Sequence, residues 1–191
     1  MGLSPIHVID FEGNLQYGIV EFGAATLKDN KIQGVTGALC RPIENSARVQ
    51  WHSRFPDNEN EASFHTYLPL FVARRKNGYF AAHHTVTEDR LLRHYQPFPG
   101  IQSGNTPLTW GPWIDTLKLY KSYIRGLSSY KVGDLIRYFQ LQPELDTYVQ
   151  VTSCATDQFH RAVYDAIATA VLLKHFIALF RVTDDIFLLK A

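Results

Sequence analysis

Two acidic residues stand at the end of a short apolar run near the start of the chain. Asp10 and Glu12 follow the β-branched stretch at 6–9. On a β-strand, residues two apart face the same side with Cα atoms about 6.5 to 7 Å apart. Both carboxylates would then point at one small volume, which is a geometry that metal ions use. Taken alone, such a pair equally describes an ordinary polar strand end.

A third acid lies in an apolar helical segment near the other end of the chain. Asp165 is surrounded by Ala162, Ala166 and Ile167, and a buried lone carboxylate is costly unless it is paired or binds a metal. Small neighbours would let this helix lie close to the strand that carries Asp10. His160 stands about 140° around the helix from Asp165, so it reaches the same place only from the preceding loop or first turn. The alternative is a capped helix with one satisfied polar residue.

A fourth acid, Asp89, falls in the first turn of a predicted helix at 87–95, for which Thr87 is a possible N-cap. A carboxylate there is stabilised by the helix dipole without any further function. The adjacent His83 and His84 would point in different directions on a strand, so they do not form a two-histidine metal site.

These residues must be positioned by an ordered set of strands and helices. Apolar periodicity and turn residues predict a meander of three strands first, and then strands alternating with helices. The expected strands are 6–9, 17–27, 31–39, 79–82 and 108–113, the expected helices are 61–75, 87–95, 114–126, 131–139 and 161–180, and the expected loops are 42–60 and 97–107. This order predicts an α/β fold with a mixed β-sheet flanked by helices.

Composition places the chain among folded proteins. Its 191 residues are 46% hydrophobic, with 12 Phe, 10 Tyr and 3 Trp, which is typical of one domain spanning 1–191 and argues against disorder. The 19 basic and 18 acidic residues give a formal net charge of +1. Any affinity for a polyanion must therefore come from a local site and not from the field of the whole protein.

The cysteines and the apolar segments favour an intracellular, cytoplasmic protein. Cys40 and Cys154 lie far apart and form no CxxC pair, so neither a disulfide scaffold nor a cysteine zinc site is encoded. The first residues show no signal-peptide pattern. The most membrane-like segment, 162–180, contains Lys174 and His175, and these polar residues favour a buried helix over a membrane span.

Taken together, these patterns resemble the DnaQ-like 3′→5′ exonucleases of the DEDDh group, which have the ribonuclease H-like fold. The resemblance covers nearly the whole chain. Its order is an Asp-x-Glu pair, a Glu-hydrophobic-Gly-Ala element, an Asp after an Ala-His motif, an Asp-Thr-Leu stretch and a final His-x-Ala-x-x-Asp-Ala. In this sequence the five corresponding segments are 8–12, 20–25, 82–89, 113–119 and 160–166, and the segment 130–135 is similar to the short helix that follows the Asp-Thr-Leu stretch in the family.

The resemblance implies a catalytic site and its metal ions. The five catalytic positions carry over as Asp10, Glu12, Asp89, His160 and Asp165. The four acids would bind two Mg²⁺ or Mn²⁺ ions, and the histidine would be the general base. The tyrosine subclass has its Tyr four residues before the last Asp; Arg161 occupies that place here, so the histidine subclass is favoured.

The substrate contacts implied by the resemblance lie beside the first two motifs. They are Phe11, Gly13, Asn14, His84 and Thr85. Gly13 and Asn14 stand where the family commonly has Thr-Thr or Thr-Gly, and Thr85 stands where it often has Asn. Phe11 could stack on a terminal base, although an aromatic residue between two acids on a strand would normally point to the opposite face and pack in the core.

Three functions remain open at this point. The first is a 3′→5′ exonuclease that acts on a single-stranded or 3′-terminal part of DNA or RNA and releases nucleoside monophosphates. The second is a non-catalytic nucleic-acid-binding module, or one associated with a DNA polymerase subunit. The third is a metal-dependent hydrolase of another phosphodiester. None of them requires a membrane, and the oligomeric state does not follow from the sequence.

Overall fold

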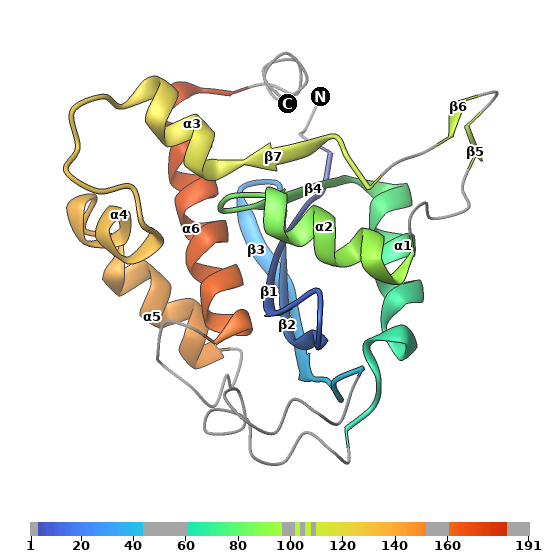
Figure 1. The fold of residues 1–191 in the computed structure, drawn as a ribbon. Helices are drawn as coiled ribbons and strands as arrows, with labels where there is room; N and C mark the ends of the chain where they lie inside the picture. Colours follow the sequence, from blue (N-terminus) through green and yellow to red (C-terminus); the bar gives the residue numbers. More distant parts are fainter. Residues whose placement is uncertain are drawn as a thin grey trace.

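A five-stranded mixed sheet forms the centre of the molecule (Figure 1). The structure is a computed structural model, and it describes residues 4–43, 61–96, 102–103, 106–107, 110–151 and 161–182. The strands are β1 (Ile6–Asn14), β2 (Gly18–Lys28), β3 (Lys31–Leu39), β4 (Tyr79–Ala82) and β7 (Trp113–Asp115). Their order is β3-β2-β1-β4-β7, in which β1, β2 and β3 are antiparallel and β4 and β7 run parallel to β1. The predicted mixed sheet is confirmed.

Helices cover both faces of this sheet (Figure 1). One face packs against α1 (Leu68–Asn77), which follows a 3-10 turn at Phe64–Thr66, and against α2 (Val86–Tyr95). The other face packs against α3 (Thr116–Tyr123), α4 (Val132–Tyr138), α5 (Gln142–Val151) and α6 (Ala162–Phe180). A small hairpin of β5 (Gln102–Ser103) and β6 (Thr106–Pro107) completes the described elements.

The alternation of side chains along β1 decides which face receives the acids. Ile6 and Val8 are buried in the core on the α6 side, whereas Ile9 and Phe11 are buried in the core on the α1 and α2 side. Because successive residues of a strand point to opposite faces, the next positions of the first set continue toward α6. Those positions are Asp10 and Glu12. The alternation that places apolar residues in both cores therefore also places both carboxylates on the α6 side of the sheet.

The apolar segment that is long enough to cross a membrane is a core helix here. α6 has 19 residues and a mean hydropathy of 1.6 over its most apolar window. It packs along the sheet, and the Tyr120 hydroxyl on α3 donates a hydrogen bond to the carbonyl of Leu172 at 3.0 Å. Lys174 pairs with Glu144 of α5, Nζ to Oε1, at 2.6 Å. The apolar residues of α6 are thus explained by packing in the core, and its polar residues by these contacts. This agrees with the buried helix that the sequence predicts.

Several predicted boundaries differ from the structure. The first strand continues through Asn14 instead of ending at residue 9, because the polar pair is still hydrogen-bonded to β2. The helix predicted over 61–75 begins at Leu68, after the 3-10 turn and with a proline at its start. Thr85, and not Thr87, occupies the N-cap position of α2, since the helix starts at Val86.

Other predictions missed elements altogether. α5 was not predicted, because it buries only Leu145 and Val149 and so leaves a weak apolar pattern. The strand expected at 108–113 is shorter and shifted, since β7 begins at Trp113. The expected loop at 97–107 includes the β5–β6 hairpin. Most of the loop expected at 42–60 lies outside the described residues.

Candidate active site

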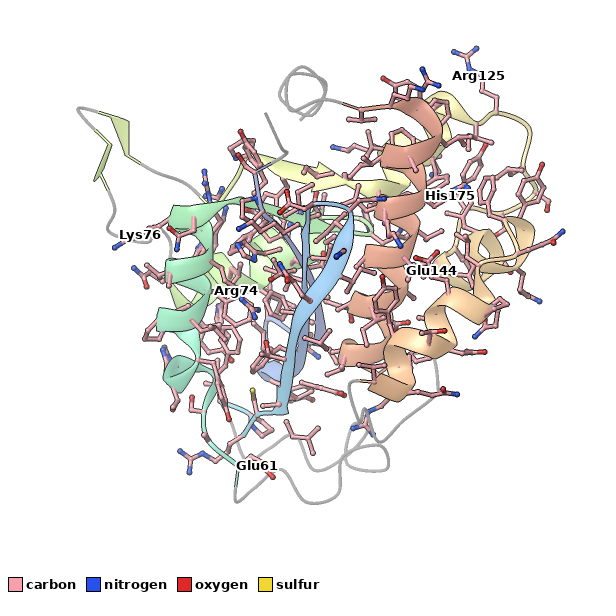
Figure 2. All side chains as sticks on the ribbon, turned by 180° about the vertical axis from the view of Figure 1, so that it is seen from behind. Glu61, Arg74, Lys76, Arg125, Glu144 and His175 are labelled. Atoms are coloured by element: carbon pink, nitrogen blue, oxygen red, sulfur yellow. The ribbon has the colours of Figure 1, made fainter. Side chains whose placement is uncertain are left out.

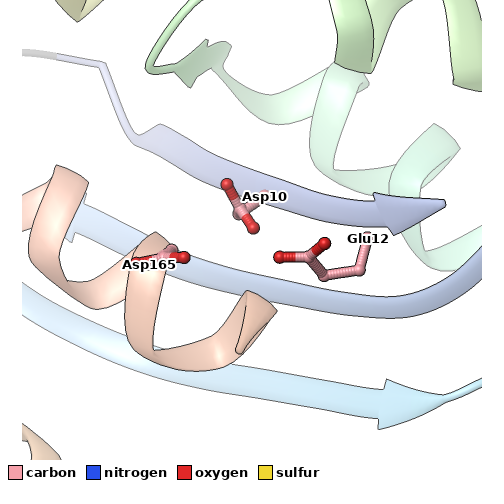
Figure 3. Close-up of side chains that lie close together, drawn as sticks. All are labelled: Asp10, Glu12 and Asp165. Atoms are coloured by element: carbon pink, nitrogen blue, oxygen red, sulfur yellow. The ribbon is translucent and has the colours of Figure 1, made fainter. Parts of the chain in front are cut away.

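Three carboxylates from opposite ends of the chain converge beside the sheet. Asp10 and Glu12 project from β1 toward Asp165 in the first turn of α6, as Figure 3 shows. One ligand atom from each of the three residues lies within 4.8 Å of the others. Each side chain is partly buried. Three oxygen donors at this separation can hold one hard divalent cation, for which carboxylate oxygens are preferred ligands.

Glycines on β2 and β3 allow α6 to lie this close to the sheet. A Cβ added to Gly23, the partner of Asp10 in the β1–β2 ladder, would lie 2.0 Å from the carbonyl oxygen of Ala162 and 2.4 Å from the amide nitrogen of Val163. A Cβ added to Gly37 on β3 would lie 2.1 Å from the Val163 side chain. Only hydrogen fits at these positions, so the glycines set the distance between Asp165 and β1.

The converging acids are electrostatically unfavourable without a cation. Burial raises the pKa of Asp10 well above its ordinary value, and the charges of Asp165, Glu88 and Glu12 raise it further. Two like charges about 4 Å apart repel by about 4 kcal/mol at an effective dielectric of about 20. A divalent cation would compensate this repulsion, so the oxygen donors and their charge both suit a bound metal ion.

Glu88, on the first turn of α2, is an acid of this group that the sequence analysis missed. It is only 5% exposed, and its Oε2 has no hydrogen-bond partner among the described residues. Burial, together with the charges of Asp115 and Glu12, raises its pKa to about 8. The sequence pattern does indicate that Glu88 is buried, because it precedes Leu91 and Leu92 by three and four residues and therefore lies on the same face of the helix.

Asp89 does not face the other acids in this structure. One of its oxygens accepts a hydrogen bond from Arg93 Nε at 2.5 Å, and the other accepts one from Trp113 Nε1 at 2.9 Å. Successive residues of a helix are rotated by about 100°, so the neighbour of Glu88 must point elsewhere. The structure therefore does not bring Asp89 together with the other acids, and its role as a metal ligand stays a prediction. Glu88 is the carboxyl of α2 whose charge acts on Asp10 and which is itself affected by Glu12.

The position of the predicted histidine base, His160, lies outside the described residues. The neighbouring Arg161, at the N-cap position of α6, is described. Its Nε donates a hydrogen bond to Oε1 of Glu21 at 3.2 Å, and Glu21 is buried on β2 directly opposite Glu12. This ion pair fixes the start of α6 to the sheet next to the acidic group.

The fold is shared with solved nuclease structures. Exonuclease X in complex with 5′-overhanging duplex DNA aligns with a TM-score of 0.64 and 22% sequence identity, over 94% of this chain and 95% of that chain. A full-length 3′-exonuclease aligns with a TM-score of 0.66 and 15% identity, over 94% and 84%. Cell-death related nuclease 4 aligns with a TM-score of 0.65 and 14% identity, over 93% and 64%. The chain has the ribonuclease H-like exonuclease fold. No protein-family model and no curated protein matches the sequence.

Within this exonuclease fold, the residues expected to contact substrate beside the first motif have structural roles. Phe11 is 6% exposed and packs against Phe64 and Phe71, with ring centroids 5.5 Å away in both cases. It is therefore in the core and not available to a base, because it alternates with the acids along β1. Asn14 Oδ1 accepts hydrogen bonds from the backbone amides of Gln16 and Tyr17, which stabilise the turn after β1. Gly13 has a φ of +152° at the β-bulge that follows Glu12.

The loop before α2 of the exonuclease fold is organised by a buried acid. Asp115, which caps α3, accepts hydrogen bonds from the backbone amides of His84 at 3.3 Å and Thr85 at 3.2 Å. Thr85 is buried and its hydroxyl also reaches Asp115, so it shapes the loop rather than facing solvent. His84 is exposed in a left-handed conformation with φ of 74°, and its contact with substrate stays a prediction.

The metal-free protein is expected to lose stability between about pH 7 and about pH 8. Carboxyl groups of the unfolded chain are ionised throughout this range, whereas Glu88 of the folded chain still retains its proton in part, because burial raises its pKa to about 8. The unfolded state then binds fewer protons, so the free energy of unfolding falls by at most about 1.4 kcal/mol per pH unit for each retained proton. Thermal melting in EDTA measures this. A melting temperature that rises over the same interval would contradict it.

Proposed function

We propose that this protein is a metal-dependent 3′→5′ exonuclease that hydrolyses phosphodiester bonds from the 3′ end of DNA or RNA and releases nucleoside monophosphates. The observation that carries the proposal is the convergence of Asp10, Glu12 and Asp165 within 4.8 Å, with Glu88 buried beside them. The likeness of the fold to exonuclease X and to a 3′-exonuclease supports the same activity.

The acids would hold two Mg²⁺ or Mn²⁺ ions, since all the donors are hard oxygens. Asp10, Glu12 and Asp165 would bind one ion, and Glu88 would help Asp10 to bind the other. When bound, such ions lower the pKa of an attacking water and stabilise the negative charge that develops on the phosphate. His160 would accept the proton of that water, which suits a group with an ordinary pKa of about 6.5.

A digestion ladder tests this function. The substrates are 5′-labelled single-stranded DNA and RNA of one sequence, incubated with Mg²⁺, with Mn²⁺ or with EDTA. We expect products that shorten one nucleotide at a time from the 3′ end, only with metal, and no ladder from Asp165→Asn. An unchanged ladder in EDTA would refute the metal mechanism, and metal-dependent binding without any hydrolysis would favour the non-catalytic module.

The contribution of Glu88 is separated from that of its neighbour by two matched substitutions. Glu88→Gln is expected to lower kcat by about 100-fold, because an amide is a weaker metal ligand, and to reduce the melting-temperature increase caused by Mn²⁺. Asp89→Asn should leave that Mn²⁺-induced increase unchanged, since Asp89 is bound to Arg93 and Trp113. Differential scanning fluorimetry with and without Mn²⁺ makes the comparison. A larger loss from Asp89→Asn would restore Asp89 as the ligand.

A further inference from the structure

A continuous groove leads away from the acidic group along the segment between α3 and α4. A cavity of about 770 Å³ has Asp10 and Asp165 at one end, and Lys121 and Lys131 among its other lining residues. A second cavity, of about 680 Å³, continues to Tyr138 at the end of α4. Both cavities are lined by Ser128, Ser129, Asp134 and Arg137, so they form one groove. Each part is large enough for a nucleotide.

The wall of this groove is held in place by buried and semi-buried hydrogen bonds. The two ring nitrogens of His83 lie 2.9 Å from the Thr116 hydroxyl and 2.8 Å from the carbonyl oxygen of Tyr130. The Tyr130 hydroxyl in turn donates to the carbonyl of Ile124 at 2.7 Å. These bonds tie β4, the start of α3 and the segment before α4 to one another, so the groove is formed before any ligand binds.

The groove has two lysines without an ion-pair partner among the described residues, although the hydrogen bond from Ser129 and the charge of Lys131 both lower the pKa of Asp134. Arg137 is paired with Asp134, which also accepts a hydrogen bond from Ser129, so this arginine is neutralised. Lys121 and Lys131 are exposed, and neither forms an ion pair with an acid of the described segments. The Nζ of Lys121 lies 6.0 Å from the centroid of the Tyr130 ring. Two lysines therefore face the groove at a point beyond the carboxylates.

An exposed aromatic ring marks the far end of the groove. Tyr138 is 61% exposed, and one side of its ring packs edge to face against Phe139 with centroids 4.9 Å apart. Packing of this kind orients the ring while most of it remains in solvent. Exposed aromatic rings that follow lysines along a groove are typical of single-stranded nucleic-acid sites, in which phosphates meet cations and bases stack on rings.

We propose that this groove binds the single strand on the 5′ side of the scissile phosphate, with Lys121 and Lys131 contacting phosphates and Tyr138 stacking on a base. The inference rests on the proposed function, because it takes the carboxylate end of the groove as the reacting end. It adds that the substrate is recognised as a single strand several nucleotides long. A duplex would need a wider surface than two lysines and one ring provide.

The charge contacts are tested with the double variant Lys121→Gln/Lys131→Gln. Its matched control is Lys28→Gln/Lys76→Gln, which removes the same charge at exposed positions that do not line the groove; Lys76 lies on α1, across the sheet from α4 and α5 (Figure 2). The Kd of a fluorescent eight-nucleotide single strand, DNA or RNA, is measured with Ca²⁺ over a range of salt. We expect the groove variant to bind at least about tenfold more weakly, and its log Kd to depend on log salt with a slope about 1.4 smaller, since each single-strand phosphate contact contributes about 0.7.

A second measurement separates this inference from the proposed function. The p-nitrophenyl ester of thymidine 5′-monophosphate fits the reacting end alone, so the wild type and the control double variant should hydrolyse it equally, whatever the groove binds. If the groove variant binds the oligonucleotide as tightly as the control does, the groove inference is wrong, whether or not the ester is cleaved. If the wild type cleaves neither substrate and the groove variant still loses binding, the exonuclease proposal fails while the groove stands.

The stacking contact is tested at Tyr138. Tyr138→Ser should weaken binding of the same oligonucleotide about tenfold, whereas Tyr138→Phe should retain it, because stacking needs the ring and not the hydroxyl. A blunt duplex of the same sequence should bind more weakly than the single strand to the wild type. Equal binding of Tyr138→Ser and the wild type, or tighter binding of the duplex, would overturn the assignment of this groove to a single strand.

Discussion

Replacing Asp10 with asparagine is expected to abolish hydrolysis and, at the same time, to stabilise the metal-free protein. Asp10 is at the centre of the acidic group, since its pKa is raised by burial and then by Asp165, Glu88 and Glu12. Loss of about 4 kcal/mol of metal-dependent transition-state stabilisation lowers kcat by roughly 10³-fold. Removal of one repelling carboxylate should raise the free energy of unfolding by about 1 kcal/mol, which corresponds to about 2 to 4 °C for a chain of this size.

The measurement for Asp10→Asn pairs single-turnover hydrolysis with thermal melting at about pH 8.5, in EDTA and in Mn²⁺. Asp29→Asn is the control, because Asp29 is an exposed turn residue in the left-handed region that asparagine tolerates. We expect Mn²⁺ to raise the melting temperature of the wild type and of the control, and to have little effect on Asp10→Asn. Lower stability of Asp10→Asn in EDTA would show that the carboxylate is satisfied by the protein itself and that the site needs no cation.

Gly23→Ala is expected to disable the site without touching any acid. The added methyl would lie 2.0 Å from the carbonyl oxygen of Ala162, a backbone atom that cannot rotate away, so the start of α6 must shift. Overpacking of this kind costs about 1 to 3 kcal/mol. Because the shift moves Asp165 away from β1, we expect the Mn²⁺-induced stabilisation and the hydrolysis to fall together, by at least about tenfold in activity.

The control for this variant is Gly34→Ala. Gly34 has a positive φ of 61° but its added Cβ would meet nothing closer than Thr26 Oγ1 at 3.7 Å. It therefore carries backbone strain, about 1 kcal/mol for a non-glycine residue in this region, without pressing on a helix. Melting curves with and without Mn²⁺ compare the two variants. If Gly23→Ala loses stability yet keeps the full response to Mn²⁺, the spacing of α6 does not control the metal site.

Much of the site could be predicted because it follows from simple periodicities. The two-residue period of a strand places Asp10 and Glu12 on one side, and the structure adds that this is the α6 side, since Ile6 and Val8 already face it. Asp165 stands out as an acid in a helix with a buried apolar surface. The mixed sheet follows from three strands in succession and then strands that alternate with helices.

The features that could not be predicted depend on the rotational position of a helix about its axis and on contacts between segments that are distant in the sequence. Glu88 and Asp89 are adjacent acids at a helix start, and choosing between them requires knowing that the helix begins at Val86 and turns Glu88 inward with Leu91 and Leu92. The resemblance to a motif selects Asp89, whose carboxylate contacts Arg93 and Trp113 in the structure. The role of Gly23 likewise depends on where α6 crosses β2, which no local pattern contains.

The assembly of the acidic group from β1 and α6 also has a consequence for the order of events during synthesis. A ribosome-bound chain that ends before α6 holds Asp10, Glu12 and Glu88 but lacks Asp165 and the helix that covers that face of the sheet. Domains fold as units once their last element has emerged. A nascent chain whose α6 has not yet emerged from the ribosome therefore has no complete metal site, and the nuclease that we propose cannot act before that helix has joined the sheet.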